Sequence, residues 1–380
     1  MILRGGSVAV APDRAEVMDV AISGGRVCAM GRALSGPSVD CSGRLILPGL
    51  VNAHDHLEFN LFSRLGKGPY RNAGEWARDI HRSFRDAIEE TLAVPLSERL
   101  YWGAIKNLLS GVTTVCHHNP WSSAFSRRFP VRVVRDVSWA HSLEFSSDLQ
   151  TRHSSCARRQ PFVFHAGEAT GVSARREMEA LAKLGMFSAN SVMVHAVGLT
   201  RNWLHLALER RCSVVWCPSS NLFTLGRTLS RRVLDSGLTI ALGTDSTLTA
   251  VGDMSDELRV ALRVSGLSPE RLYGMVTDEP AKALRLRRGE GSIRIGGVAD
   301  LAIFRLRAHT PAQTLLRQRP EAVMVGGRLE MVAAEFAPAW RTARISRLSS
   351  LRTADRTIFL RVPPPVHRQS ICLAGRRVES

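Results

Sequence analysis

Residues 47–57 read Leu-Pro-Gly-Leu-Val-Asn-Ala-His-Asp-His-Leu, an apolar run that ends in two histidines separated by one residue. Side chains two residues apart on a β-strand point to the same side, so His54 and His56 can reach one metal ion together. The stretch therefore predicts a strand that carries a chelating pair. An alternative interpretation is that the two histidines belong to an exposed loop, and the rest of the chain decides between the two.

Three further apolar runs end in a residue that can bind a metal. Residues 162–165 end in His165, residues 192–195 in His195 and residues 240–245 in Asp245. In an α/β barrel, the carboxyl ends of the parallel strands meet at one face, which is where such a barrel carries its active site. The four runs therefore predict a metal site on top of an α/β barrel.

At these residues the chain resembles the amidohydrolase superfamily, in its branch of cytosine deaminase and chlorohydrolase-like enzymes. The resemblance extends from the N-terminus to about residue 333, and the order and spacing of the motifs make it specific. The His-Ala-Gly-Glu tetrad is also similar to that of adenosine deaminases. The motifs are Pro48-Gly49 followed by His54-x-His56, His165-Ala166-Gly167-Glu168, His195, Cys217-Pro218-Ser219-Ser220-Asn221, and Gly243-Thr244-Asp245-Ser246.

The resemblance implies a set of site residues around one divalent ion, Zn²⁺ or Fe²⁺, of which Zn²⁺ is preferred here. It makes His54, His56, His165 and Asp245 the ligands, a donor set that leaves a position open for water. Asp245 would also accept a proton from that water. Glu168 would donate a proton to the ring nitrogen of the substrate, and His195 would orient the water or stabilise a developing oxyanion.

The lysines bear on the number of metal ions. Binuclear amidohydrolases of the dihydroorotase and urease type bridge two ions with a carboxylated lysine at the end of a barrel strand. Lys67, Lys106, Lys183 and Lys282 are the only lysines, and none of them lies at such a place in the sequence. We therefore expect a mononuclear site.

Several alternatives stay open for these residues. Glu168 could lie in the N-cap region of the following helix, Asp245 could cap a helix, and His195 could be a packed core histidine. Further histidines, His117, His118 and His141, also lie at predicted strand ends and could face the substrate or be structural. Residues 218–221 have the composition of a turn in any protein.

The expected activity is hydrolysis of a non-peptide carbon–nitrogen bond. The preferred reaction within this class is hydrolytic deamination of a cyclic amidine in a nitrogen heterocycle. One alternative is a cyclic amide hydrolase or a dechlorinase-like hydrolase, because an activated water does not dictate the leaving group. Another is a non-catalytic binding or scaffold relative. Such relatives typically lose metal ligands, whereas this chain retains all of them.

The fold class expected is α/β, a TIM-like (β/α)8 barrel at residues 46–290 with a small discontinuous β-sandwich domain at 1–45 and 291–335. Only seven barrel strands are evident, with a single strand over 131–141. The interval from 141 to 162 is too short for a full unit, so we expect one unit to be eroded there. The Arg-rich tail at 337–380 shows no packing period, and we expect it to be disordered.

Composition limits the partners. The formal net charge is +17, but 47 of the 51 basic residues are arginine and they are spread along the chain, which is typical of codon bias. We therefore expect a small-molecule substrate and neither nucleic acid nor membrane as a partner, with a homodimer left open. No signal peptide or membrane span is evident, and the seven scattered cysteines favour reduced thiols, so a cytoplasmic location is expected.

Overall fold

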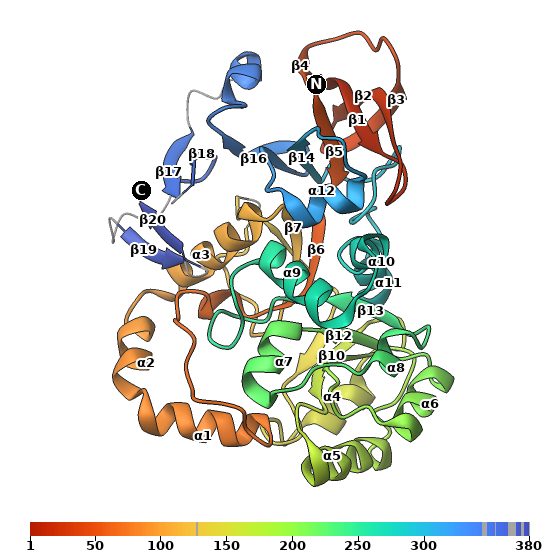
Figure 1. Ribbon diagram of the computed structural model, residues 1–380, viewed down its shortest axis with the longest axis vertical. Coiled ribbons are helices and arrows are strands. Elements are labelled where there is room, and N and C mark those ends of the chain that lie inside the picture. The colour runs from red at the N-terminus through yellow and green to blue at the C-terminus, as the bar shows by residue number, and fades with distance from the viewer. Residues whose placement is uncertain (127, 344–347, 354, 364–369, 374–375, 380) are drawn as a thin grey trace.

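The computed structural model describes residues 1–380 except 127, 344–347, 354, 364–369, 374–375 and 380. A barrel of parallel strands with surrounding helices forms one part of the molecule, and a mixed β-sheet lies against one end of it (Figure 1). Helices α1 and α2 extend to one side of the barrel (Figure 1). Both ends of the chain lie in the mixed sheet, so the barrel is inserted between its first and last strands.

The barrel strands form two parallel sheets, one of three strands and one of five, in the described part of the chain. The order is β6-β7-β8 in the first and β13-β12-β11-β10-β9 in the second. Their bounds are β6 (Leu50–Asp55), β7 (Val112–His117), β8 (Arg132–Val133), β9 (Ser138–Ala140), β10 (Phe162–Ala166), β11 (Ser191–His195), β12 (Ser213–Trp216) and β13 (Thr239–Leu242).

Two seams join these sheets, and they differ. At the seam between β13 and β6, the amide of Asp245 donates to the carbonyl of His54 at 3.0 Å, which brings two site residues together. At the other seam, β8 and β9 share no ladder and are joined by residues 134–137. The barrel is therefore closed beside the predicted site and interrupted between β8 and β9.

This interruption corrects the count of barrel units. The single strand expected over 131–141 is divided into β8 and β9, so the described residues supply eight strands and the predicted barrel is confirmed. Residues 134–137 are too few to form a crossover helix, so the unit that is reduced lies there and not between 141 and 162. That later interval holds α4 (Leu149–Ser155) and leads into β10.

The helices cover the outside of the barrel and its site face. Between β6 and α3 the chain forms two helices, α1 and α2, which meet at Phe84. The bounds are η1 (Leu57–Phe59), α1 (Ala73–Ser83), α2 (Arg85–Leu92), α3 (Leu96–Leu109), α5 (Gly171–Lys183), α6 (Arg201–Glu209), α7 (Pro218–Leu225), α8 (Arg231–Leu234), α9 (Met254–Ser265), α10 (Pro269–Gly274), α11 (Asp278–Ala283), α12 (Pro311–Arg317) and η2 (Ala337–Ala343).

The barrel interior is packed with small and β-branched side chains, as the taper of a closed barrel requires. These residues form one buried cluster below the site residues. Because they fill the lumen, chemistry is confined to the end of the barrel where the polar residues lie. The cluster includes Val51, Ala53, Cys116, Val163, Val192, Val194, Val215 and Ala241.

The mixed sheet gathers strands from both ends of the chain into one twelve-stranded sheet in the described residues, where a small sandwich was expected. β1 pairs in parallel with β4 and β5, and its other neighbour β2 is antiparallel. The domain limits at residues 45 and 291 stay a prediction. The bounds are β1 (Ile2–Ala9), β2 (Ala15–Ser23), β3 (Arg26–Gly31), β4 (Ser38–Asp40), β5 (Arg44–Pro48), β14 (Leu301–Arg305), β15 (Ala322–Val325) and β16 (Arg328–Ala333).

The described part of the tail differs from the disorder expected for 337–380. β17 (Ser349–Thr353) and β18 (Thr357–Leu360) form a hairpin, and β18 pairs antiparallel with β16. Leu351, Ile358 and Leu360 are fully buried there, so short alternating apolar runs extend the edge of the sheet. β19 (Ser370–Leu373) and β20 (Arg376–Glu379) continue it, and the remaining tail positions lie outside the described residues.

The described residues contain neither a membrane-spanning helix nor a disulfide bond. None of the helices found there combines the length and the apolar character needed to cross a membrane. The cysteines described there are all free thiols.

Candidate metal centre

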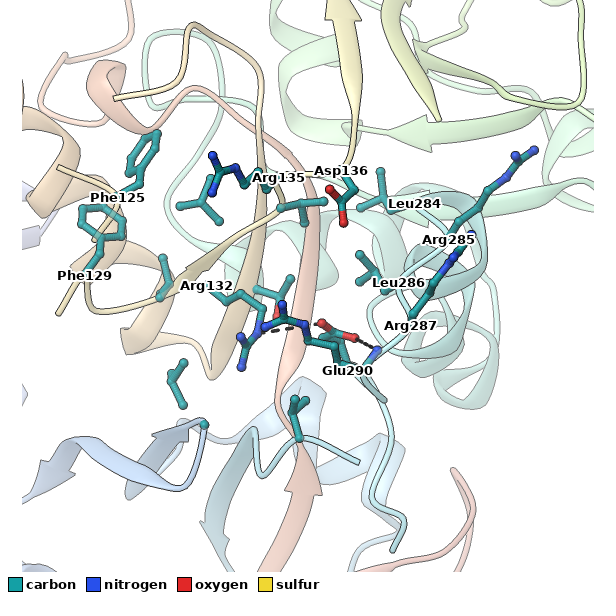
Figure 2. A pocket seen from close by; sticks show the side chains of 18 of the residues that line it. Phe125, Phe129, Arg132, Arg135, Asp136, Leu284, Arg285, Leu286, Arg287 and Glu290 are labelled. Carbon is teal, nitrogen blue, oxygen red and sulfur yellow. Dashed lines mark hydrogen bonds and ion pairs between the residues drawn. The ribbon is translucent and has the colours of Figure 1, made fainter. Parts of the chain in front are cut away.

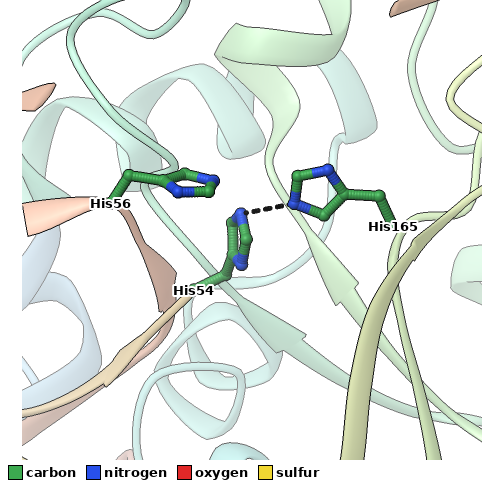
Figure 3. A group of neighbouring side chains, drawn as sticks. All are labelled: His54, His56 and His165. Carbon is green, nitrogen blue, oxygen red and sulfur yellow. Dashed lines mark hydrogen bonds between the residues drawn. The ribbon is translucent and has the colours of Figure 1, made fainter. Parts of the chain in front are cut away.

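The expected ligands converge at the carboxyl ends of the barrel strands. His54 lies near the end of β6 and His56 just after it, His165 lies near the end of β10, and Asp245 follows β13. The Nε2 atoms of His54 and His165 are 3.3 Å apart. Oδ1 of Asp245 lies 3.8 Å from Nε2 of His54 and 3.7 Å from Nε2 of His56. Figure 3 shows the three imidazole rings turned toward a common point.

These separations fit a small tetrahedral ion. Zinc bonds of about 2.0–2.1 Å in tetrahedral geometry place two ligand atoms about 3.4 Å apart. In the described residues, the buried Nδ1 atoms of His54 and His56 have no hydrogen-bond partner. Burial and neighbouring imidazoles hold the pKa of His54 and His165 well below the usual value, so both rings present a free lone pair near neutral pH. The donor set therefore fits a divalent ion such as Zn²⁺ or Fe²⁺.

Asp245 is held in place by hydroxyl groups. Its Oδ2 accepts hydrogen bonds from Ser220 at 2.7 Å and from Thr249 at 3.0 Å, which leaves Oδ1 facing the histidines. Burial acts to raise the pKa of Asp245, but His56, His195 and these hydroxyls outweigh it and lower that pKa. Asp245 caps no helix, since α9 begins after Asp253. Its φ of +53° is unusual for a non-glycine residue and is typical of a position fixed by its surroundings.

Glu168 faces two site histidines. Its Oε2 lies 3.6 Å from Nε2 of His195 and 3.8 Å from Nδ1 of His165. Burial, with the added effect of Asp245, raises the pKa of Glu168 well above the usual value, which favours the protonated form of the carboxyl. The N-cap of α5 is Thr170, so Glu168 does not cap that helix.

Gly167 sets the turn that places Glu168. It has a φ of +61°, and a side chain there would come within 3.0 Å of the backbone nitrogen of Gly198. Its amide donates to Glu177 at 2.9 Å. The glycine therefore lets the chain turn sharply between a site histidine and Glu168.

His195 ends β11 with its ring fully enclosed. Nδ1 lies 3.1 Å from the side-chain amide of Asn221, and a donor there leaves the proton on Nε2, toward Glu168. Burial lowers the pKa of His195 to about 4. Residues 218–221, which read as a turn in the sequence, form the first turn of α7 and supply both Ser220 and Asn221 to the site.

Known proteins resemble this chain in sequence over most of its length. The Amidohydrolase family model matches residues 152–329. A 5-methylthioadenosine/S-adenosylhomocysteine deaminase from Pyrococcus furiosus is 26% identical over 76% of this chain and 82% of that protein. A 5'-deoxyadenosine deaminase from Methanothrix thermoacetophila is 25% identical over 81% of this chain and 86% of that protein. These matches confirm the resemblance to the amidohydrolase superfamily that was stated from the motifs.

Solved structures share the fold of this chain. An adenosine deaminase from Xanthomonas campestris with bound zinc superposes with a TM-score of 0.73 at 20% identity, over 90% of this chain and 96% of that chain. An atrazine chlorohydrolase from Arthrobacter aurescens, complexed with zinc, superposes with a TM-score of 0.68 at 20% identity, over 86% of this chain and 94% of that chain. These matches establish the barrel and its attached sheet as a known arrangement.

Sequence reasoning missed a buried polar network beneath the metal centre. Lys106 on α3 lies 3.0 Å from Oδ2 of Asp55 and donates to Oγ1 of Thr244 at 3.0 Å. Asn52 donates to both Asp55 and Thr244, and its Oδ1 accepts from the amide of Thr244 at 3.1 Å. The network ties β6 to the residues after β13. The available signal was a lysine inside an apolar helical run of an arginine-rich chain.

The other histidines lie beside the candidate metal centre. His118 is fully buried, and its ring stacks on that of His165 at 4.6 Å between centroids, while its Nε2 contacts the carbonyl of Ala140 at 2.9 Å. His141 is half-buried and forms a second group of possible ligands with His118 and His165. His117 turns instead toward Glu58, 3.6 Å away. His141 is thus the one of the three placed to meet a substrate.

A segment after β6 crosses the site face. The amide of Tyr70 donates to Thr224 of α7 at 2.6 Å, and the amide of Ala73 donates to the carbonyl of Glu168 at 3.2 Å. Phe59 stacks on His56 with ring centroids 5.6 Å apart. The segment between β6 and α1 therefore covers the candidate metal centre.

Proposed function

We propose that this amidohydrolase is a metal-dependent hydrolase that removes an amino group from a nitrogen heterocycle, with Zn²⁺ as the best-suited ion. The observation that carries the proposal is Glu168, a buried carboxyl located between His165 and His195 whose pKa is raised by burial. A neutral carboxyl at that place can protonate a ring nitrogen, which makes the adjacent carbon more open to attack by water.

The relatives support the same leaving group. They include deaminases of 5-methylthioadenosine, S-adenosylhomocysteine and 5'-deoxyadenosine, each of which carries an adenine ring. We therefore propose an adenosine-type nucleoside as the first substrate class to test. Specificity in a barrel enzyme lies in the loops at its mouth, here including the segment with Phe59 and Tyr70.

Each site residue has a role that its contacts support. When bound, a divalent ion lowers the pKa of a water molecule and so supplies a nucleophile at neutral pH. His54, His56, His165 and Asp245 would hold that ion. Asp245, ionised by its hydroxyl partners and neighbouring imidazoles, accepts the proton of the water at Oδ1.

Proton transfer then balances the reaction. Glu168 donates its proton to the ring nitrogen, and Nε2–H of His195 donates a hydrogen bond to the oxygen that adds to the ring carbon. The water oxygen replaces the amino group, which takes up the proton held by Asp245 and leaves as ammonia, and the hydroxyl left on the ring carbon returns a proton to Glu168. Asn221 keeps His195 in the tautomer that this step requires, through its contact with Nδ1 at 3.1 Å.

Ammonia release from a substrate panel tests the proposal. The zinc-loaded protein is incubated with 5'-methylthioadenosine, S-adenosylhomocysteine, 5'-deoxyadenosine, cytosine and a chlorinated triazine. We expect ammonia from at least one amino-substituted ring. Chloride release from the triazine alone, or ring opening of a cyclic amide, would replace deamination with those hydrolyses. Metal binding without turnover on any compound would favour a binding or scaffold protein.

A homodimer and a cytoplasmic location are further proposals. The location is supported by the scattered cysteines, which are free thiols in the described residues. Sedimentation of the purified protein and fractionation of its natural host test them. A monomer at all concentrations, or recovery outside the cytoplasm, would contradict them.

A further inference from the structure

A cavity of about 1100 Å³ lies at the opposite end of the barrel from the metal centre. It is bounded by the segment that carries β8, by residues 157–161 before β10, by residues 284–290 after α11, and by two turns of the mixed sheet, 24–26 and 325–328. Pro161 on its wall precedes β10, whereas His165 lies near the end of that strand, about 13 Å farther along. Apolar side chains of the barrel interior separate the two places.

Arginine is more frequent among the residues that line the cavity than in the chain as a whole. Eight of its 28 lining residues are arginine, against 47 of 380 in the whole sequence. The lining carboxylates are Asp136 and Glu290. Arg132 lies across the centre of the cavity in Figure 2, paired with Asp300 at 3.1 Å and 3.9 Å from Glu290. The remaining lining arginines therefore far outnumber the acidic groups.

Four of these arginines have no carboxylate partner in the described residues. Arg135, Arg159, Arg287 and Arg288 are exposed, and no ion pair involves them. Arg135 lies over the ring of Trp121, 5.3 Å from its centroid. A guanidinium group without a carboxylate presents several N–H donors that match phosphate oxygens in pairs.

The walls also offer a place for a flat ring. Phe125 and Phe129 lie on one side of the cavity and Leu284 and Arg287 on the opposite side (Figure 2). Thr114 lines the cavity from β7, and its hydroxyl is buried without a hydrogen-bond partner in the described chain. An unsatisfied buried hydroxyl favours a polar ligand or water beside it.

We propose that this cavity binds a small molecule that carries a di- or triphosphate group, of the nucleoside polyphosphate class. Its arginines come from five separate segments that converge on a concave space of ligand size. A nucleic acid binder instead presents its basic residues as an open stripe that follows a backbone. The phosphates bind Arg287, Arg288 and Arg159, and the base packs near Trp121 and Phe125.

Calorimetric titration with ATP and with pyrophosphate tests this site in the zinc-loaded full chain. We expect ATP to bind the wild-type protein, and the double variant Arg287→Ala/Arg288→Ala to weaken that binding at least about tenfold, the usual effect of losing a charge-assisted phosphate contact. The pair Arg135→Ala/Arg159→Ala should weaken it as well, so the test does not depend on one variant folding.

Arg175→Ala/Arg176→Ala is the matched control, because these arginines are exposed on α5 and the change in charge is the same. ATP binding should be unaffected in this variant. Equal weakening of ATP binding in the control variant and in the cavity variants, or no ATP binding at all, would overturn the proposal. Binding of a single-stranded oligonucleotide that the cavity variants abolish, with no binding of ATP, would replace it with a nucleic acid site. None of these outcomes bears on deamination, since the cavity variants leave the metal centre intact.

Discussion

Removing the buried ammonium group of Lys106 should destabilise the protein by about 3 kcal/mol. The side chains of Lys106 and Asp55 are 1% and 0% exposed, and their charged atoms are 3.0 Å apart. Breaking a buried ion pair by removing one partner costs about 3–5 kcal/mol, because the other charge stays buried without compensation. Asp55 keeps hydrogen bonds from Asn52, Asn60 and Asn107, which places the expected cost of Lys106→Met at the lower end of that range.

The assay is urea denaturation of the metal-loaded protein, with the metal affinity measured in parallel. The matched control is Lys183→Met: Lys183 pairs with Glu179 on α5, but its side chain is 73% exposed, so the change should cost less than about 0.5 kcal/mol. Because the network ties His54 to Thr244 beside Asp245, metal affinity should also fall, by about 10–100-fold in Lys106→Met. A loss of stability below about 1 kcal/mol with unchanged metal affinity would refute the reasoning.

Three further predictions follow from particular contacts. Glu168→Gln should keep bound zinc and lower kcat by about a hundredfold or more on the substrate found in the ammonia screen. The control Glu179→Gln should leave kcat unchanged. Normal turnover in Glu168→Gln would reject the role of Glu168 as an acid. Truncation after Glu335 should lower the free energy of unfolding by about 3 kcal/mol or more, because it removes the buried Leu351, and an unchanged denaturation midpoint would show that the tail is dispensable. Burial raises the pKa of Glu330 to about 7, so its charged form is disfavoured in the folded protein and stability should fall as the pH rises toward 7. Glu330→Gln should therefore stabilise the protein more at pH 8 than at pH 5. An equal change in stability at the two pH values would contradict this prediction.

The convergence of the candidate ligands could be predicted because these residues follow strands. An apolar run that ends in a histidine reveals both the strand and the end at which its ligand lies, and parallel strands bring those ends together without any long-range information. The spacing of His54 and His56 carries the same information within one strand. Roles that depend on exact placement, such as those of Glu168 and His195, rest on proton positions that only the assembled site defines.

The missed features depend on contacts between distant segments. Lys106 and Asp55 are 51 residues apart, and each looks ordinary in its own helix or strand. The division of residues 131–141 into β8 and β9 arises where the ladder is interrupted, which hydrophobic runs do not reveal. The buried hairpin of β17 and β18 has strands too short to show a period, so its polar, arginine-rich composition favoured disorder.

The number of metal ions bound per chain tests the central claim most directly. Elemental analysis of the protein, purified after expression with added zinc and dialysed, should return about one equivalent. His54, His56, His165 and Asp245 offer one set of four donors to a single ion, and the described lysines offer no bridging group at a strand end. Two tightly held equivalents, or none, would contradict a mononuclear hydrolase at this centre.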